Sequence, residues 1–161
     1  MSSTIGDTLR LTLFGRSHGP VIGMTLAGIP AGKALSPAAL QAFLDRRAPG
    51  RSPLSTARQE ADIPRFLSGL NGGVTTGEDI TPDIENTDVR SADYEILSAV
   101  PRPGHADYTA YVKYGRIEPG GGPFSGRMTA ALCIAGGICL QLLEQAGISV
   151  LSRIRSIGPV N

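Results

Sequence analysis

The chain has 161 residues and a mass of 16.8 kDa, which is enough for one domain with a hydrophobic core. Its 41% hydrophobic and 18% charged residues are typical of a globular protein, and its net charge of +1 argues against binding nucleic acid or a membrane. The longest apolar run, residues 128–140, is too short to cross a bilayer. We therefore expect a cytoplasmic protein that has neither nucleic acid nor a membrane as a partner.

Two strands joined by a short turn are predicted near the N-terminus. Residues 9–14 alternate between apolar and polar side chains, and residues 21–26 place three apolar side chains on one face. The six residues between them are too few for a crossover connection, so the strands should pair antiparallel. His18 would then lie at the tip of a hairpin.

The first helix is predicted to begin at Pro37. Ser36 can cap this helix by accepting a hydrogen bond from a free backbone N–H, and proline suits the first helical position. Three apolar residues recur at helical spacing and should form the buried face: Leu40, Phe43 and Leu44. A Pro-Gly pair at residues 49–50 ends the helix.

The remaining elements are predicted from the same periodicities. They are a hairpin of residues 66–70 and 74–76, strands at 80–84 and 108–114, a helix at 124–145 and a strand at 148–154. The long helix is apolar nearly all round, so it should be buried on several sides, and Gly147 suits the position after its end. Strands and helices joined by hairpins rather than by strict alternation indicate an α+β layered fold.

The two cysteines, Cys133 and Cys139, lie inside the long apolar helix. Their spacing matches no metal or redox motif. We expect two buried thiols in a reducing compartment.

Charge is distributed unevenly along the chain. Four arginines gather around the end of the first helix: Arg46, Arg47, Arg51 and Arg58. In a nearly neutral protein, such a cluster favours binding of a small anion such as a phosphate. We interpret the acidic residues between positions 78 and 95 as a solvated face.

The only two histidines, His18 and His105, each lie in a short, polar, glycine-flanked segment. Loops often carry catalytic groups, and imidazole titrates near physiological pH, so both are candidate proton donors. The alternative is that each is a structural loop residue.

A glycine run at residues 120–122 precedes the long helix, whose first turn contains Ser125 and Arg127. Backbone N–H groups at a helix N-terminus attract anions, and Arg127 adds positive charge. The alternative is a flexible link into a buried helix. The run matches neither a Walker A loop nor the dinucleotide-binding fingerprint.

Several motifs, taken in order, resemble those of the chorismate synthase family from about residue 4 to the end of the chain. They are Gly-Arg-Ser-His-Gly at 15–19, Arg-Arg-Ala-Pro-Gly at 46–50, Gly-Gly-Val-Thr-Thr-Gly at 72–77, Ile-Glu-Asn-Thr-Asp at 84–88, Arg-Pro-Gly-His-Ala-Asp at 102–107 and Gly-Gly-Gly-Pro-Phe-Ser-Gly-Arg at 120–127. The Arg-Pro-Gly-His-Ala-Asp run is the most specific of these.

The resemblance implies a layered β-α-β sandwich, of which residues 1–161 would form the N-terminal part of a single domain. It also implies a carbon–oxygen lyase of the shikimate pathway, which leads to the aromatic amino acids. Family members eliminate phosphate from 5-enolpyruvylshikimate 3-phosphate to form chorismate. They need reduced FMN although the reaction has no net redox change, and NADPH is one candidate reductant. They form homotetramers.

The resemblance further assigns roles to individual residues. His18 matches the acid that protonates the departing phosphate, and His105 matches the acid that protonates the reduced flavin. Three arginines match positions that bind anionic groups of the substrate: Arg47, Arg102 and Arg127. The position of Arg47 is alternatively one that binds a nicotinamide nucleotide, and Ser125 matches a serine that contacts the flavin. No metal is implied.

Several positions depart from the common family pattern. Arg16 stands where most members carry Glu, and Glu118-Pro119 occupies the place of an Asp-x-Arg segment. Pro53 replaces a basic residue that accompanies the one at Arg47.

Family members are much longer than this chain. We therefore expect an N-terminal portion that carries both histidines, holds an incomplete FMN site and is inactive alone. The alternative is a truncated or degenerate, non-catalytic protein that binds phosphates or an intact subunit.

Overall fold

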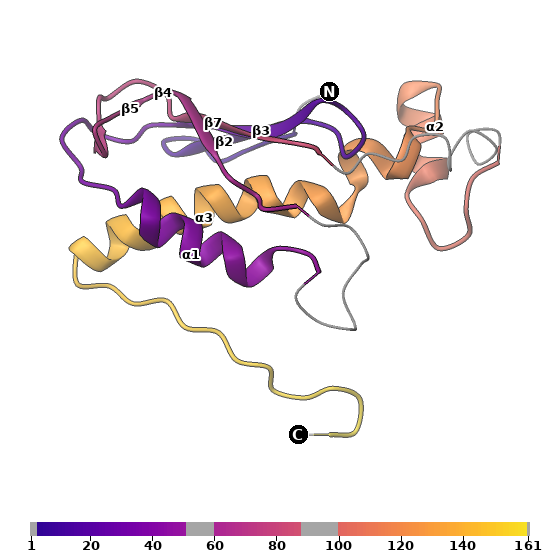
Figure 1. Cartoon of the computed structure of the whole chain (residues 1–161). Coiled ribbons are helices and arrows are strands. Elements are labelled where there is room, and N and C mark those ends of the chain that lie inside the picture. The colour runs from indigo at the N-terminus through magenta and orange to yellow at the C-terminus, as the bar shows by residue number, and fades with distance from the viewer. Residues whose placement is uncertain (1–2, 51–59, 88–99, 161) are drawn as a thin grey trace.

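An antiparallel sheet lies along one side of two helices in the computed structural model, which describes residues 3–50, 60–87 and 100–160 (Figure 1). In spatial order the strands of this sheet are β1 (Ser3–Ile5), β2 (Arg10–Gly15), β3 (Val21–Ala27), β7 (Thr81–Glu85) and β4 (Arg65–Ser68). A separate two-stranded hairpin consists of β5 (Leu70–Asn71) and β6 (Val74–Thr75).

The helices divide into a covering pair and a distal one. Helices α1 (Pro37–Arg47) and α3 (Thr129–Gln145) pack side by side beneath the sheet, whereas α2 (Asp107–Tyr114) lies beyond one end of the sheet (Figure 1). Two 3₁₀ segments, η3 (Pro119–Phe124) and η4 (Gly126–Met128), connect α2 to α3. The α+β layered fold is thus confirmed, with one sheet layer and one helical layer in the described residues.

The predicted N-terminal hairpin is confirmed. Strands β2 and β3 pair antiparallel, from Arg10 opposite Ala27 to Gly15 opposite Ile22. The turn between them is held from outside by Asn86, whose Nδ2 donates to the backbone oxygens of Arg16 and Gly19 at 3.1 and 2.8 Å. His18 therefore lies in a turn that is anchored at both ends.

Helix α1 begins and ends where its sequence predicts. The backbone N–H of Ala39 donates to Oγ of Ser36 at 3.1 Å, and Pro37 is the first helical residue. Leu40 and Leu44 are buried, and Phe43 is half-buried. The last turn carries two arginines, whose charge suits the negative end of the helix dipole.

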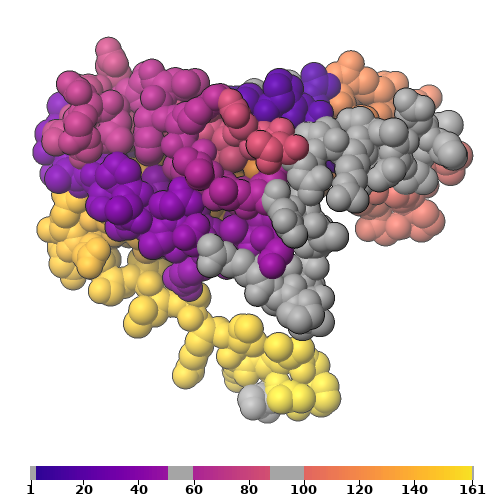
Figure 2. Space-filling view, in the orientation of Figure 1, coloured from indigo at the N-terminus to yellow at the C-terminus, as the bar shows by residue number. Residues whose placement is uncertain are grey.

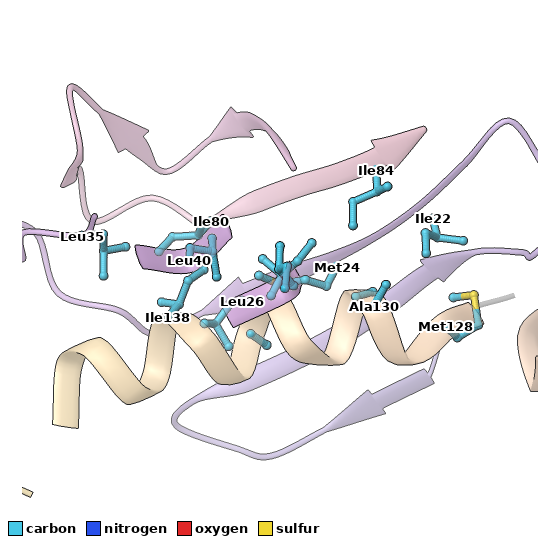
Figure 3. Close-up of a cluster of buried hydrophobic side chains, with 14 of the residues drawn as sticks. Ile22, Met24, Leu26, Leu35, Leu40, Ile80, Ile84, Met128, Ala130 and Ile138 are labelled. Carbon is cyan, nitrogen blue, oxygen red and sulfur yellow. The ribbon is translucent and has the colours of Figure 1, made fainter. Parts of the chain in front are cut away.

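The core lies between the sheet and the two long helices (Figure 3). Alternate residues of β3 point into it, as the period of a strand requires, and residues four apart on α3 meet them. Its largest apolar side chains, all at most 2% exposed, are Ile22, Met24, Leu26, Leu44, Ile80, Ile84, Ile134 and Ile138.

Helix α3 corrects two predictions. It begins at Thr129 rather than near residue 124, because residues 126–128 form a 3₁₀ turn capped by Ser125. It packs against both α1 and the sheet, but it is not buried all round, since Leu132 is 43% exposed. The segment Gly126–Gln145 is long and apolar enough to cross a membrane by length and composition alone. However, 44% of an 18-residue window of this segment is buried inside the protein, where α3 packs against α1 and the sheet. Gly147 takes the left-handed conformation predicted beyond the helix end.

The predicted strand at 108–114 is wrong, because these residues form α2. Their tyrosines and valine favour strands, but no sheet edge lies beside them within the described residues. Asp107 in the first turn and Gly115 in left-handed conformation after the last turn instead support a helix.

The structure differs from two further strand predictions. Residues 148–154 are extended but pair with no described strand, so they form no sheet. Residues 65–68 pair with β7 in the main sheet, so the predicted hairpin is reduced to β5 and β6.

The predictions of two buried thiols and of a solvated acidic face are each only partly correct. Cys133 and Cys139 are half-buried, and burial raises the pKa of both thiols. Asp83 is buried rather than solvated, and it accepts two hydrogen bonds from Arg65 at 2.9 and 3.0 Å.

Candidate functional site

The glycine run at residues 120–122 packs against both histidines. All three glycines have positive φ angles, 60°, 86° and 51°, which favour glycine over other residues. A Cβ atom on Gly120 would lie 2.4 Å from Nε2 of His18, and one on Gly121 would lie 2.8 Å from Cε1 of His105. Consecutive Cα atoms are about 3.8 Å apart, so the two imidazoles meet neighbouring points of one loop. Both histidines are half-buried.

His105 belongs to a compact group with Arg102 and Asp107. Nδ1 of His105 lies 2.7 Å from Oδ1 of Asp107, whose side chain is 1% exposed. Arg102 donates to the same carboxylate from Nε at 2.7 Å, from Nη2 at 3.0 Å and from its backbone N at 3.1 Å. The hydrogen bonds from the Arg102 side chain outweigh burial and hold the pKa of Asp107 well below its ordinary value.

The predicted arginines Arg47 and Arg127 are brought together by a carboxylate that lies between them. Asp62, which is fully buried, forms ion pairs with both guanidinium groups. Arg127 also pairs with Glu60 and donates from Nε to Oδ1 of Asn86 at 3.1 Å. The side chain of Arg127 is 3% exposed and that of Arg47 is 22% exposed. Of the two, Arg47 is therefore more accessible to a ligand.

Ser125 lies beside the same glycine loop. Its Cβ is 3.9 Å from the point that a Cβ on Gly121 would occupy, and its Oγ accepts from the backbone N–H of Arg127 at 3.3 Å. This cap serves the short η4 turn, whereas α3 begins after that turn. The glycine run thus does not lead directly into the long helix.

A third group of charged residues links the segment just before the glycine loop to the turn of the N-terminal hairpin. Glu118, which is buried, accepts from Arg16 at 2.9 Å and from Arg116 at 2.7 Å. Burial opposes ionisation of Glu118, but these two guanidinium groups prevail and its pKa is lowered. A cavity of about 150 Å³ opens beside them, lined also by Gly15 and Pro123.

Sequence reasoning missed the carboxylates and the amide of this region. They are Glu60, Asp62, Asp107, Glu118 and Asn86. A detectable signal existed, since buried arginines require counter-charges and several of these residues lie inside the family motifs or next to them. Arg51, Pro53 and Arg58 lie outside the described residues. Within residues 3–50, 60–87 and 100–160, no group of three His, Cys, Asp or Glu side chains could hold a metal ion.

The fold and this region define an α+β domain in which two imidazoles pack against one glycine loop, with Arg102 beside His105 and with Arg16 and Arg116 paired to Glu118. The chorismate synthase family model matches residues 9–161. The chain belongs to the chorismate synthase family.

Similar curated proteins support the same assignment. Chorismate synthase of Lancefieldella parvula is 44% identical over 164 residues, covering 100% of this chain and 43% of that protein. Chorismate synthase of Porphyromonas gingivalis is 48% identical over 159 residues, covering 98% of this chain and 43% of that protein. A crystal structure of chorismate synthase matches with a TM-score of 0.61 at 28% identity, covering 88% of this chain and 36% of that one. The chain thus spans 43% of the length of these two curated relatives.

Proposed function

We propose that this chain is the N-terminal portion of a chorismate synthase, a lyase that eliminates phosphate from 5-enolpyruvylshikimate 3-phosphate. The main support is that His18 and His105, both in family motifs, pack against adjacent glycines of one loop. Elimination of a phosphate needs an acid for the leaving group and cationic partners for its charge. The two imidazoles pack against this loop, and Arg102 lies beside His105.

In the proposed reaction, His18 donates a proton to the departing phosphate. Arg47 and Arg102, which are 22% and 28% exposed, bind anionic groups of the substrate, or a nicotinamide nucleotide in the case of Arg47. Arg127 also serves the substrate, although its three nitrogens already face Glu60, Asp62 and Asn86. A guanidinium group has five N–H donors, so these partners do not use all of them, but the Arg127 side chain is only 3% exposed.

The described residues fit one edge of a reduced FMN. His105 offers a proton at a half-buried position, and Ser125 offers a hydroxyl next to it, both beside Gly121. When bound, the reduced flavin supplies the electron-rich ring that the elimination needs, and NADPH is the candidate source of its electrons. His105 holds the proton that balances the charge of that ring.

The proposal places the protein in the shikimate pathway of aromatic amino acid biosynthesis, in the cytoplasm and in a homotetramer. The substrate is a small molecule.

A chimera tests the function. This chain would replace the matched segment of the P. gingivalis chorismate synthase, and chorismate formation would be measured with reduced FMN. We expect turnover, and we expect His18→Ala and His105→Ala each to lower kcat by about 100-fold or more. Glu78→Gln, at an exposed position outside the candidate site, is the matched control and should keep the rate of the chimera.

Two results would contradict the proposal. One is a folded chimera that forms no chorismate, which would favour the degenerate, non-catalytic alternative. The other is an active chimera whose rate is unchanged by both histidine substitutions.

A further inference from the structure

Asp107 has a relation to His105 that the proposed chemistry leaves unexplained. One carboxylate oxygen lies 2.7 Å from Nδ1 of the imidazole. The other ring nitrogen, Nε2, lies 3.1 Å from the point that a Cβ on Gly121 would occupy. The two nitrogens of one ring therefore have different neighbours, a buried carboxylate and the loop.

The carboxylate of Asp107 can only accept hydrogen bonds. Arg102 donates to it three times, and these contacts hold its pKa well below the ordinary value, so it carries no proton at neutral pH. Two lone pairs facing each other at 2.7 Å would repel. Nδ1 of His105 must therefore carry a hydrogen and donate it to Asp107.

Arg102 does not compete for Nδ1 in the plane of the ring. Its Nη2 is 3.3 Å from both Nδ1 and Nε2 of His105. An in-plane atom at equal distances of this size would collide with Cε1, so the guanidinium nitrogen lies over the ring face. Arg102 thus restrains the rotation of the imidazole from above the ring face, while Asp107 contacts Nδ1 at the edge of the ring.

We infer that Asp107 is a positioning residue that fixes neutral His105 as the Nδ1–H tautomer and leaves Nε2, at the glycine loop, as the atom that gains and loses the catalytic proton. A proton leaving the imidazolium breaks the Nε2–H bond, leaves the electron pair on Nε2 and preserves the Nδ1–H bond to Asp107. The use of that proton on a flavin rests on the proposed function, whereas the tautomer does not.

Nitrogen NMR of the imidazoles tests the inference directly. The chain contains only two histidines, so a His18→Gln variant assigns the remaining ring signals to His105. In uniformly ¹⁵N-labelled protein, long-range ¹H–¹⁵N spectra above the titration range of the ring distinguish a nitrogen that carries hydrogen from one that does not. We expect Nδ1 of His105 to carry the hydrogen and Nε2 to be bare.

Asp107→Asn retains the shape of the side chain but removes its charge, and Asp107→Ala removes the acceptor. We expect both to shift the population of His105 toward the Nε2–H tautomer. Asp83→Asn is the matched control, because Asp83 is also buried and bonded to an arginine but lies on β7. It should leave the tautomer of His105 unchanged.

A wild-type spectrum with hydrogen on Nε2 of His105 would overturn the inference, whether or not the variants fold. So would a folded Asp107→Ala variant with an unchanged tautomer, because alanine offers no acceptor for the Nδ1–H bond. The readout involves neither flavin nor substrate, so its failure is distinguishable from an inactive chimera.

Discussion

At the scale of single residues, the candidate site consists of charges that are buried in pairs. Arg47 and Arg127 face Asp62 and Glu60, so two positive and two negative groups cancel in the interior. Asp62 has a φ angle of 50°, which is rare for a residue with a side chain. An unpaired ion would be costly at this depth, and this explains why the carboxylates accompany the arginines.

The first prediction concerns Asp62. Asp62→Asn leaves two guanidinium groups without their shared counter-charge, so the free energy of unfolding should fall by about 3 kcal/mol. Urea denaturation followed by circular dichroism measures the loss. Asp79→Asn, which removes an exposed carboxylate, should change stability by less than about 0.5 kcal/mol. Equal effects of the two substitutions would show that the buried ion pairs contribute little.

At the scale of elements, helices α1 and α3 approach closely at a glycine. A Cβ on Gly137 would lie 2.5 Å from Cδ1 of Leu40 and 3.1 Å from Cδ1 of Phe43, whereas one on Gly136 would meet no atom within 4 Å. Gly136 and Gly137 are neighbours in one helix, but a methyl group added at Gly137 would contact α1, whereas one added at Gly136 would contact nothing within 4 Å.

The second prediction uses this pair. Gly136→Ala should stabilise the protein by about 0.5–1 kcal/mol through helix propensity alone. Gly137→Ala gains the same propensity but crowds the buried Leu40, so we expect a net loss of about 1–2 kcal/mol. Thermal and urea unfolding of both variants decide the matter. Stabilisation by Gly137→Ala would mean that the crossing has room for a methyl group.

The hairpin and the glycine loop are joined by an ion pair whose two positions both depart from the family pattern. By the resemblance described above, Arg16 stands where most members carry Glu, and Glu118 stands in the place of an Asp-x-Arg segment. In this chain the two side chains meet at 2.9 Å. The departures are thus complementary, with charges that attract each other.

The third prediction is a charge reversal across this pair. Arg16→Glu and Glu118→Arg should each destabilise the protein, and the double variant should recover about 1 kcal/mol relative to the sum of the single effects. The coupling is modest because Arg16 is 51% exposed at its side chain. Unfolding free energies of the four proteins give the coupling, and additive single effects would rule it out.

At the scale of the whole molecule, the residues after α3 leave the body formed by the sheet and the helices (Figure 2). They are extended, and Leu151 and Ile154 are 93% and 76% exposed. The chain also spans 43% of the length of the curated relatives described above. In the proposed function, the described residues therefore supply proton donors and cations to only part of the site.

The fourth prediction follows from this incomplete site. The 161-residue chain alone, given reduced FMN and 5-enolpyruvylshikimate 3-phosphate, should form no measurable chorismate, whereas the chimera should form it. A reaction at one face leaves the flavin and the leaving phosphate exposed to water and without the remaining binding groups. Turnover by the isolated chain would show that these residues suffice.

The local elements of this protein were predictable wherever a short motif determines them. Ser36 and Pro37 specify the start of α1, and the alternation in residues 9–14 and 21–26 specifies the first hairpin. The prediction of a strand at residues 108–114 was wrong, because tyrosine and valine favour strands only where a sheet edge is available. The family was likewise evident from motifs, and the same motifs made both histidines candidate site residues.

The sequence alone determined which residue types are available for the proposed chemistry, because histidine, arginine and glycine occur in contiguous motifs. Only the tertiary structure decided their partners. Asp62 meets Arg127 and Glu118 meets Arg16 across long stretches of chain, and such pairings depend on how the elements pack rather than on local spacing. The same packing brings His18 and His105 to neighbouring glycines of one loop.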